Sequence, residues 1–588
     1  MKDHFKELLL TAYKQLQQQG LIPDDLESSI KIDNTRNSAH GDFACNMALA
    51  LAKKIGMNPR ELAQRIVDSL PPSDSIAKVE IAGPGFINAF LKQGAQQQVI
   101  AEILRQKQDY GRCKAGTKHK IHLEFVSANP TGPLHVGHGR GAAYGATLAN
   151  LLTAAGHPVH REYYVNDAGR QMDILAVSVW LRYLDLCGEE VIFPTNGYQG
   201  DYIWDIAASL HREHAEKFLH PFDTVYANVP ADGPDGDKEA HIDALIANCR
   251  SLLTEEEYRT VFSQGLTEIT ANIRQDLEEF GVHYDEWFAE SSLVESGQVD
   301  EVIDSLQRAG HLYEKNGAVW FRSSALGDEK DRVVIRENGL KTYLATDIAY
   351  HANKLKRGYD EIIDIWGADH HGYVPRVKAS MQALGLDDSK LEVLLVQFAI
   401  LYRGGEKAQM STRAGEFVSL RQLRHEVGND AARFFYVLRK CEQHMDFDLD
   451  LAKSQSKDNP VYYIQYAHAR VCSVLQKLQQ KDMEYDEAQG LENLGLLDTD
   501  YEQALVIRLA QYPEQLLRAA QAREPHQLAY YLRELANEFH TYYNAKDVKK
   551  ILDEEDERRN ARLCLSLAVR QVIANGLELL GVSAPESM

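Results

Sequence analysis

The sequence is poor in the features that mark secreted, disulfide-bonded or membrane-embedded proteins. Its seven cysteines, an odd number spread from Cys45 to Cys564, include no C-x-x-C pair. Neither a disulfide framework nor a cysteine zinc site is indicated. No apolar run approaches the roughly 20 residues needed to cross a bilayer, and the acid-containing start has too short an apolar stretch for a secretion signal. We expect a soluble cytoplasmic protein with no structural zinc and no membrane partner.

Positive charge is also scarce. The chain has 64 Lys and Arg against 86 Asp and Glu, a formal net charge of -22. Contact with phosphate normally calls for a basic field, so this balance counts against nucleic-acid binding at first sight. The objection is not decisive, because a large protein can gather its Lys and Arg on one face.

The length predicts several folded units. A single core seldom grows beyond about 250 to 300 residues, and the chain has 588, of which 44% are hydrophobic. Changes of pattern suggest a small α+β domain over 1–112, an α/β domain over 113–453 with an insertion at about 187–280, and an all-α bundle over 454–588. The insertion contains a turn-rich acidic loop to which we assign no chemistry.

The central domain has the pattern of a nucleotide-binding sheet. A strand from Lys120 to Val126 is followed by a helix beginning near Gly141 and a strand from Val159 to Val165. A second strand-helix-strand unit begins near Glu361 and ends near Phe398. Two such units predict a doubly wound, Rossmann-like parallel sheet, whose ligands bind beyond the carboxyl ends of the strands.

The loop after the first of these strands carries the strongest clue to function. His135 and His138 are three positions apart, so they lie on one side of a helical turn, and Gly137 between them lets a flat ligand approach the backbone. The helix N-terminus behind them favours phosphate. This layout is expected of a site that binds ATP and stabilises negative charge as pyrophosphate leaves.

The segment His135-Val136-Gly137-His138 resembles the HIGH signature of class I aminoacyl-tRNA synthetases. The preceding Ser-Ala-Asn-Pro-Thr-Gly-Pro-Leu resembles the arginyl branch, and further family-like segments run from residue 40 to the C-terminus. The resemblance implies an arginine-tRNA ligase that uses ATP with Mg²⁺, forms arginyl-adenylate and transfers arginine to tRNA(Arg), releasing AMP and pyrophosphate. It also suggests a monomer whose N-terminal domain contacts the elbow of the tRNA.

Free arginine presents a planar guanidinium, for which two carboxylates match both charge and direction. The resemblance places these acids at Glu290 and at Asp347, and Tyr343 would share a helix face with Asp347 because the two are four apart. Asn129 corresponds to the contact with the ammonium and carboxylate of arginine. His371 would also line the arginine pocket.

The resemblance places ATP against His135, Gly137, His138, Gly367 and His370. His370 and His371 beside an Asp could suggest a metal site, but no further ligand cluster is evident, so we expect none. The mobile KMSKS loop of the class corresponds to 409–413, where Met410 and Ser411 match but Gln409 and Thr412 replace both lysines. We therefore expect other groups to meet the phosphate charge, and the catalytic candidates are His135, His138, Lys407 and Arg413.

The C-terminal bundle resembles the anticodon-binding module of the same family. Aromatic rings and arginine would suit stacking on unpaired bases, although each ring could equally belong to the core. The candidates for tRNA binding are Tyr462, Tyr466, Arg470, Tyr542, Tyr543 and Met588.

Two other functions remain compatible with the sequence. The missing lysines would suit a tRNA-binding paralogue that keeps the fold but has lost activation. A ligase that forms adenylates of a smaller substrate would share the His-x-Gly-His loop, but it would not need the N-terminal and C-terminal units.

Overall fold

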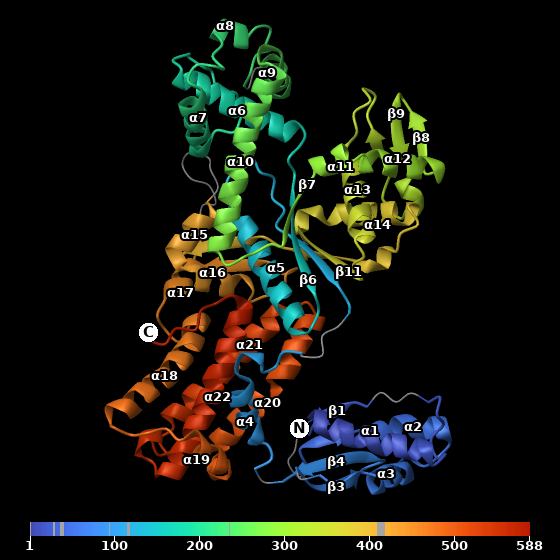
Figure 1. The fold of residues 1–588 in the computed structure, drawn as a ribbon, viewed down its shortest axis with the longest axis vertical. Coiled ribbons are helices and arrows are strands. Elements are labelled where there is room, and N and C mark those ends of the chain that lie inside the picture. Colours follow the sequence, from blue (N-terminus) through green and yellow to red (C-terminus); the bar gives the residue numbers. More distant parts are fainter. Residues whose placement is uncertain are drawn as a thin grey trace.

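The computed structural model describes residues 2–26, 30–35, 40–73, 75–92, 94–113, 118–233, 236–408 and 418–588. Figure 1 shows an N-terminal unit, a central α/β core with two additions that project from it, and a C-terminal helical bundle. The predicted fold class, a parallel-sheet core between an α+β unit and an all-α unit, is confirmed.

The N-terminal unit packs three helices on a four-stranded sheet and has its own hydrophobic core. Phe5, Leu51 and Ile66 from the helices meet Ile87 of the sheet, all 2% exposed or less. The sheet has the order β1-β2-β4-β3. The elements are α1 (Lys2–Gln18), β1 (Ile32–Asn34), β2 (Phe43–Cys45), α2 (Met47–Ile55), α3 (Pro59–Asp68), β3 (Ile76–Ala82) and β4 (Phe86–Leu91).

The helix that follows this unit, α4 (Gln98–Gln106), belongs to a different core. Its buried Ile100 and Ile103 join the main hydrophobic cluster of the molecule, and α4 packs against α20 and α22 of the C-terminal bundle. The N-terminal core therefore ends before α4, whereas the sequence alone placed the limit of that unit at residue 112.

The central sheet is parallel throughout, in the order β12-β11-β5-β6-β7. Four of its strands match the predicted βαβ units, and β7, only four residues long, was not anticipated. Leu123 and Phe125 face the helix α5, whose Gly145 lies directly against the Phe125 ring. The elements are β5 (Ile121–Phe125), α5 (Val136–Ala154), β6 (Val159–Val165), β7 (Glu286–Ala289), β11 (Glu361–Gly367) and β12 (Leu391–Val396).

Helix α5 begins at Val136, five residues before the predicted start near Gly141. The sequence placed His135 and His138 on one side of a helical turn, and the structure makes this turn the first turn of α5. The His135 side chain caps the helix by accepting a hydrogen bond from Gly137 N at 3.0 Å. A side-chain acceptor at this position satisfies a backbone donor that the helix leaves unpaired.

Two additions interrupt the core. The first, at the top of Figure 1, is helical, and its long helix α10 descends to α15 and α16 beside the sheet. It comprises α6 (Arg170–Leu186), α7 (Asp201–His214), α8 (Phe222–Val225), α9 (Lys238–Leu252) and α10 (Glu255–Glu279). The second places a three-stranded antiparallel sheet beside three helices: α11 (Ser291–Glu295), α12 (Gln298–Arg308), β8 (Leu312–Lys315), β9 (Ala318–Phe321), β10 (Arg332–Ile335) and α13 (Tyr343–Lys356). Helix α14 (Val374–Ala383) connects β11 to β12 and packs on both strands.

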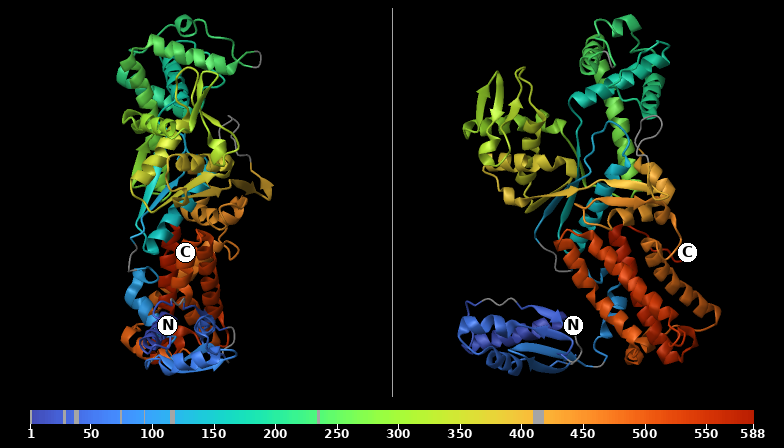
Figure 2. Two further views of the ribbon diagram at one scale, coloured as in Figure 1. Left: turned by 90° about the vertical axis from the view of Figure 1, so that its right-hand side faces the viewer. Right: turned by 180° about the vertical axis from the view of Figure 1, so that it is seen from behind.

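A further small sheet, of order β14-β13-β15, and three short helices connect the core to the bundle. These elements are β13 (Ala399–Arg403), β14 (Glu406–Lys407), α15 (Leu420–Val427), α16 (Asn429–Tyr436), β15 (Met445–Asp448) and α17 (Leu449–Lys453). The bundle contains α18 (Pro460–Gln480), α19 (Glu487–Glu492), α20 (Asp500–Gln521), α21 (Pro525–Asn544) and α22 (Asp556–Leu580). Figure 2 shows the bundle below the core and the N-terminal unit beside it.

One described helix, α22, is long and apolar enough to cross a membrane by length and composition. No such segment was expected from the sequence. The most apolar window of α22 is 78% buried inside the protein. Arg562 of the same helix makes buried ion pairs with Glu502 and Glu554, both at 2.7 Å. These features are those of the central helix of a bundle.

Candidate active site

The loop between β5 and α5 has a strained start. Val126 and Ser127 have φ angles of 71° and 40°, in the left-handed region that side chains rarely adopt. Two contacts from β6 hold the turn: Ser127 Oγ accepts a hydrogen bond from Tyr164 N at 3.1 Å, and the Tyr163 hydroxyl donates to the carbonyl of Ala128 at 2.8 Å. Such strain costs on the order of 1 to 3 kcal/mol per residue and tends to occur at functional sites.

His135 and His138 form a stacked pair at the first turn of α5, with ring centroids 3.7 Å apart. Nδ1 of His135 accepts from Gly137 N, and Nδ1 of His138 accepts from His135 N at 3.3 Å. Burial lowers the pKa of both imidazoles, and repulsion from His135 helps to bring the pKa of His138 to about 3. Both rings are therefore neutral near pH 7 and carry their proton on Nε2, from which they can donate to an anion.

A cleft of about 350 Å³ lies in front of these histidines, at the carboxyl end of the sheet. Trp366 and Phe398 contribute apolar rings to its walls, and neither was anticipated from the sequence. Six of the predicted ligand-binding residues line it: Asn129, His135, Gly137, His138, Gly367 and His370. The cleft thus combines apolar walls with the helix N-terminus, an arrangement suited to a nucleotide.

Glu290 and Asp347, the predicted guanidinium ligands, lie close enough to repel each other. Glu290 directly follows β7, and Asp347 projects from the first turns of α13. Burial and the Asp347 charge raise the pKa of Glu290 to about 7, and burial raises the pKa of Asp347 to about 6. Within the described residues, neither carboxylate has an ion pair at 4 Å or less. A cation bound between the two acids would stabilise their ionised forms, so the pair has the character of a cation-binding site.

Asn166, which was not predicted, links this acidic pair to the nucleotide cleft. Its side chain lies 3.2 Å from that of Asn129, and in its better-satisfied amide orientation it donates to Glu290 Oε2 at 2.8 Å. Asn129 itself lines the cleft beside His135. The two predicted subsites therefore adjoin.

Two further predicted arginine contacts lie at the solvent boundary. Tyr343 is 42% exposed. Its hydroxyl lies close to Gly169, because a Cβ added to that glycine would be only 2.9 Å from the hydroxyl oxygen. His371 is exposed in the short helical segment after β11, with Nδ1 3.3 Å from the carbonyl of Ala368. Tyr343 thus faces the turn that follows β6, whereas the hydrogen-bond contact of His371 among the described residues is with Ala368 and not with the acidic pair.

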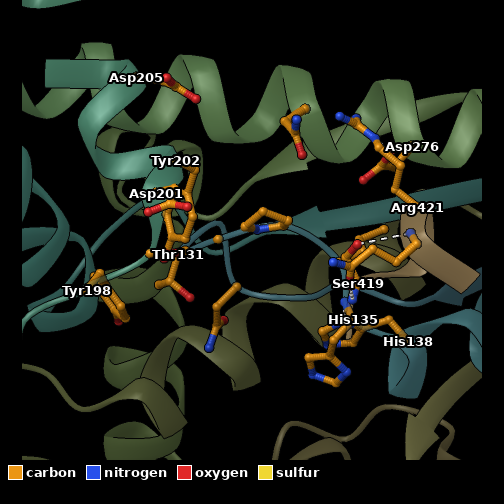
Figure 3. Close-up of a pocket in the computed structure, with 17 residues that line it drawn as sticks. Thr131, His135, His138, Tyr198, Asp201, Tyr202, Asp205, Asp276, Ser419 and Arg421 are labelled. Carbon is orange, nitrogen blue, oxygen red and sulfur yellow. Dashed lines mark hydrogen bonds and ion pairs between the residues drawn. The ribbon is translucent and has the colours of Figure 1, made fainter. Parts of the chain in front are cut away.

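A second cavity, of about 750 Å³, opens on the other side of the histidine turn. Figure 3 shows His135 and His138 beneath Ser419 and Arg421, with Asp276 beside Arg421 and Asp201, Tyr202 and Asp205 at the far end. Arg421 Nε donates to Asp276 Oδ1 at 2.7 Å, which ties α15 to the end of α10. Two backbone hydrogen bonds, Val136 N to Val418 O and Leu420 N to Leu134 O, fix α15 against the histidine turn.

The remaining catalytic candidates adjoin or fall within the segment 409–417. Met410, Ser411 and Arg413 lie outside the described residues. Lys407 is exposed at the end of β14, two residues before that segment begins.

One group of described side chains has the spacing of metal ligands, but an arginine already occupies it. His160, Glu162 and Glu286 present ligand atoms within 4.8 Å of one another. Arg357 contacts Glu162 at 2.6 Å and Glu286 at 2.8 Å. The cluster is therefore an ion-pair network, and it lies away from the exposed His370 and His371.

The predicted tRNA contacts divide into surface and core residues. Arg470 lies over the rings of Tyr466 and Tyr543, at 4.6 and 4.7 Å, and Tyr462 stacks on Tyr466 at 6.2 Å. Tyr466 is 36% exposed, and Met588, at the end of the chain, is 51% exposed.

Tyr542 differs from these residues. It is 3% exposed, with its hydroxyl 3.5 Å from the buried Glu502. Its ring packs in the core of the bundle, so the prediction that it stacks on a base was wrong. Its neighbour Tyr543 faces Arg470, and the sequence could not show which of two adjacent tyrosines points outward.

The raised pKa of Glu290 generates a prediction about stability. In the unfolded chain this carboxyl ionises near 4.5, whereas in the folded state it holds its proton up to about 7. Stability is therefore lost as the pH rises through this window. We expect Glu290→Gln to raise the free energy of unfolding by about 1 to 3 kcal/mol at pH 8, and by little at pH 5, in urea denaturation. The exposed Glu295→Gln serves as the control, and a gain independent of pH would contradict the assignment.

The chain matches three family descriptions that together cover most of its length. They are the "Arginyl tRNA synthetase N terminal domain" over 2–91, "tRNA synthetases class I (R), catalytic domain" over 99–189 and 209–445, and the "DALR anticodon binding domain" over 464–588.

Curated relatives agree over the full length. The chain is 60% identical to an arginine–tRNA ligase of Thioalkalivibrio sulfidiphilus and 56% identical to one of Legionella pneumophila, each covered over 100% of both chains. Its fold matches the solved arginyl-tRNA synthetase of Thermus thermophilus with a TM-score of 0.70 at 23% identity, over 99% of this chain and 100% of that one. The chain belongs to the arginyl-tRNA synthetases of class I.

Proposed function

We propose that this protein ligates L-arginine to tRNA(Arg) at the expense of ATP, through an arginyl-adenylate. The observation that carries the proposal is the junction of two subsites at Asn129. A cleft headed by two neutral imidazoles and a helix N-terminus adjoins a pair of acids, the buried Glu290 and the half-buried Asp347, whose raised pKa values favour occupation by a cation. Arginine and ATP are the two ligands that would complement these surfaces.

The acidic pair would hold the guanidinium, and Asn129 would hold the ammonium and carboxylate of arginine. An oxygen of that carboxylate attacks the α-phosphorus of ATP, and the bond to pyrophosphate breaks. Nε2–H of His135 and of His138 would donate to the phosphate oxygens as charge develops, and the positive end of the α5 dipole would favour that charge. The terminal hydroxyl of the tRNA then attacks the carbonyl carbon of the adenylate, and AMP leaves.

Neutral imidazoles supply dipoles but no net charge, so the departing pyrophosphate requires cations. We assign this role to Mg²⁺ bound by the phosphates, to Lys407 and to Arg413. Lys407 is suitably placed because it is exposed and close in sequence to the loop that would cover the phosphates. We further propose that the protein acts as a cytoplasmic monomer without structural zinc and without a membrane partner.

The first test is ATP–pyrophosphate exchange with each amino acid, with and without tRNA(Arg). We expect exchange with arginine alone among the amino acids, because two carboxylates match the guanidinium whereas the ammonium of lysine would leave acceptors unpaired. We also expect tRNA(Arg) to raise the rate of exchange with arginine strongly. No exchange under either condition, together with retained binding of tRNA, would support the impaired-paralogue alternative.

Gly137→Ala tests the histidine turn. A Cβ at this position would lie 2.7 Å from Cε1 of His135 and 3.2 Å from Phe398, so the ring must move from its capping position. We expect kcat of aminoacylation to fall by about 10-fold to 100-fold, with the melting temperature little changed. Gly495→Ala, in the bundle between α19 and α20, is the control, since its Cβ would meet nothing within 4 Å and it does not line the cleft. Equal activity of the two variants would remove the turn from the catalytic site.

Tyr466→Ala tests the RNA face of the bundle. Loss of an exposed ring stacked between Tyr462 and Arg470 is expected to raise KM for tRNA(Arg) by about 5-fold or more, with KM for arginine unchanged at saturating tRNA. Tyr530→Ala is the control, because Tyr530 is 45% exposed but lies at the opposite end of α21 from Tyr543. Unchanged KM for tRNA in the Tyr466 variant would exclude this face.

A further inference from the structure

A row of four carboxylates crosses the central sheet. The strand register places Asp364 of β11 opposite Glu124 of β5, Glu124 opposite Glu162 of β6, and Glu162 opposite Glu286 of β7. Asp364 and Glu162 are 0% exposed and Glu124 is 6% exposed. Neighbouring strands are only about 4.8 Å apart, so buried acids in register would repel one another strongly unless cations were brought to them.

Helix α13 brings two cations to this row. Lys354, itself 0% exposed, contacts Glu124 Oε2 at 2.5 Å and Asp364 Oδ1 at 2.8 Å. Arg357, directly after the helix, contacts Glu162 and Glu286 at 2.6 and 2.8 Å. Each basic side chain therefore bridges two neighbouring acids, and the two are three residues apart, on one face.

Two more side chains of α13 complete the attachment. The Tyr350 hydroxyl donates to Glu162 Oε1 at 2.7 Å. His351 contacts Asp364 Oδ2 through Nε2 at 3.0 Å and the backbone carbonyl of Asp347 through Nδ1 at 2.8 Å. His351 thus links the acid row directly to the residue that projects into the acidic pocket.

Because Asp347 lies on the same helix, the contacts between α13 and the acid row also determine the position of Asp347. Asp347 lies seven residues, nearly two turns, before Lys354, and therefore on the same face of the helix, about 10 Å further along its axis. The opposite side of α13 packs through apolar residues, among them Leu344 and Ile348, in the core of the second addition. Apolar packing is not directional, whereas the paired bridges to four acids have defined donor and acceptor atoms and therefore specify one position of the helix.

We propose that Lys354, with His351 and Arg357, acts as a set of positioning residues for amino-acid selection: the acid row of the sheet fixes the rotation and axial position of α13, and so fixes Asp347 for the guanidinium. This inference rests on the proposed role of Asp347 in binding arginine. Buried ion pairs contribute little net stability compared with apolar packing of the same volume. Here the ion pairs define the position of the helix. A pocket for a planar guanidinium needs its carboxylates placed to within a fraction of an ångström.

The test compares Lys354→Met with Lys356→Met in the full-length enzyme. Lys356 lies two residues away on the same helix but is exposed, with its one ion pair at 3.9 Å. We expect Lys354→Met to raise KM for arginine by about 10-fold to 100-fold, with KM for ATP within about twofold of the parent enzyme, measured by pyrophosphate exchange. Lys356→Met should leave both unchanged.

A milder variant keeps the proposal testable should Lys354→Met not fold. Asp364→Asn preserves shape and leaves Lys354 paired with Glu124, and it should raise KM for arginine by a smaller factor while the protein stays folded. Unchanged KM for arginine in the folded variants, with only the unfolding midpoint lowered, would show that the network is structural alone. Equal increases in KM for arginine and for ATP would also overturn the inference.

Asp347→Asn separates this inference from the function on which it rests. If Asp347→Asn leaves KM for arginine unchanged, the assignment of Asp347 to the guanidinium fails. If Asp347→Asn raises KM for arginine but neither Lys354→Met nor Asp364→Asn does so, only the positioning role fails.

Discussion

The arrangement of the site depends on the in-register, parallel pairing of β11, β5, β6 and β7. Parallel strands end at one edge of a sheet, and each of these strands is followed there by a polar residue of the site. Asn129 follows β5, Asn166 follows β6, Glu290 follows β7 and His370 follows β11. Residues separated by more than 200 positions in the chain are thereby brought to one edge. A shift of one residue in any pair would turn the buried side chains to the opposite face and disperse the site.

The electrostatics of the free site are unfavourable in a way that its ligands would correct. The histidines are held neutral by burial, and the two acids of the pocket carry raised pKa values because they are desolvated and face each other. The strained turn at Val126 adds to this cost. A guanidinium would neutralise the acids, and phosphates would use the donors of the helix start. The acid row inside the central sheet differs from this pair, because Lys354 and Arg357 already form ion pairs with its carboxylates.

The sequence predicted the parts of this structure that are local. Alternation of apolar strands with helical patterns was enough for the βαβ units, and the His-x-Gly-His spacing was enough for the turn. The predicted start of α5 was five residues too late, because the cap that stabilises the first turn comes from a histidine, an uncommon capping residue.

Features that depend on long-range pairing could not be predicted in the same way. Strand β7 is four residues long and becomes recognisable only beside β6. Each of the four strands contributes one acid to the row, but the sequence alone could not show this, because the alignment of the acids depends on the register of the strands. The burial of Tyr542 next to the accessible Tyr543 likewise follows from the packing of α21.

One feature of the hydrophobic core bears on how the two ends of the enzyme communicate. The apolar cluster runs without interruption from Ile100 in α4 to Val582 after α22, through both the sheet and the bundle. The flank of α5 is held by the bundle, since Tyr144 donates to the carbonyl of Arg523 at 2.7 Å and Asn150 to that of Leu579 at 3.1 Å. Helix α5, which carries the two histidines in its first turn, therefore packs along its flank against the C-terminal bundle. A displacement of that bundle would therefore act directly on the helix that carries both histidines.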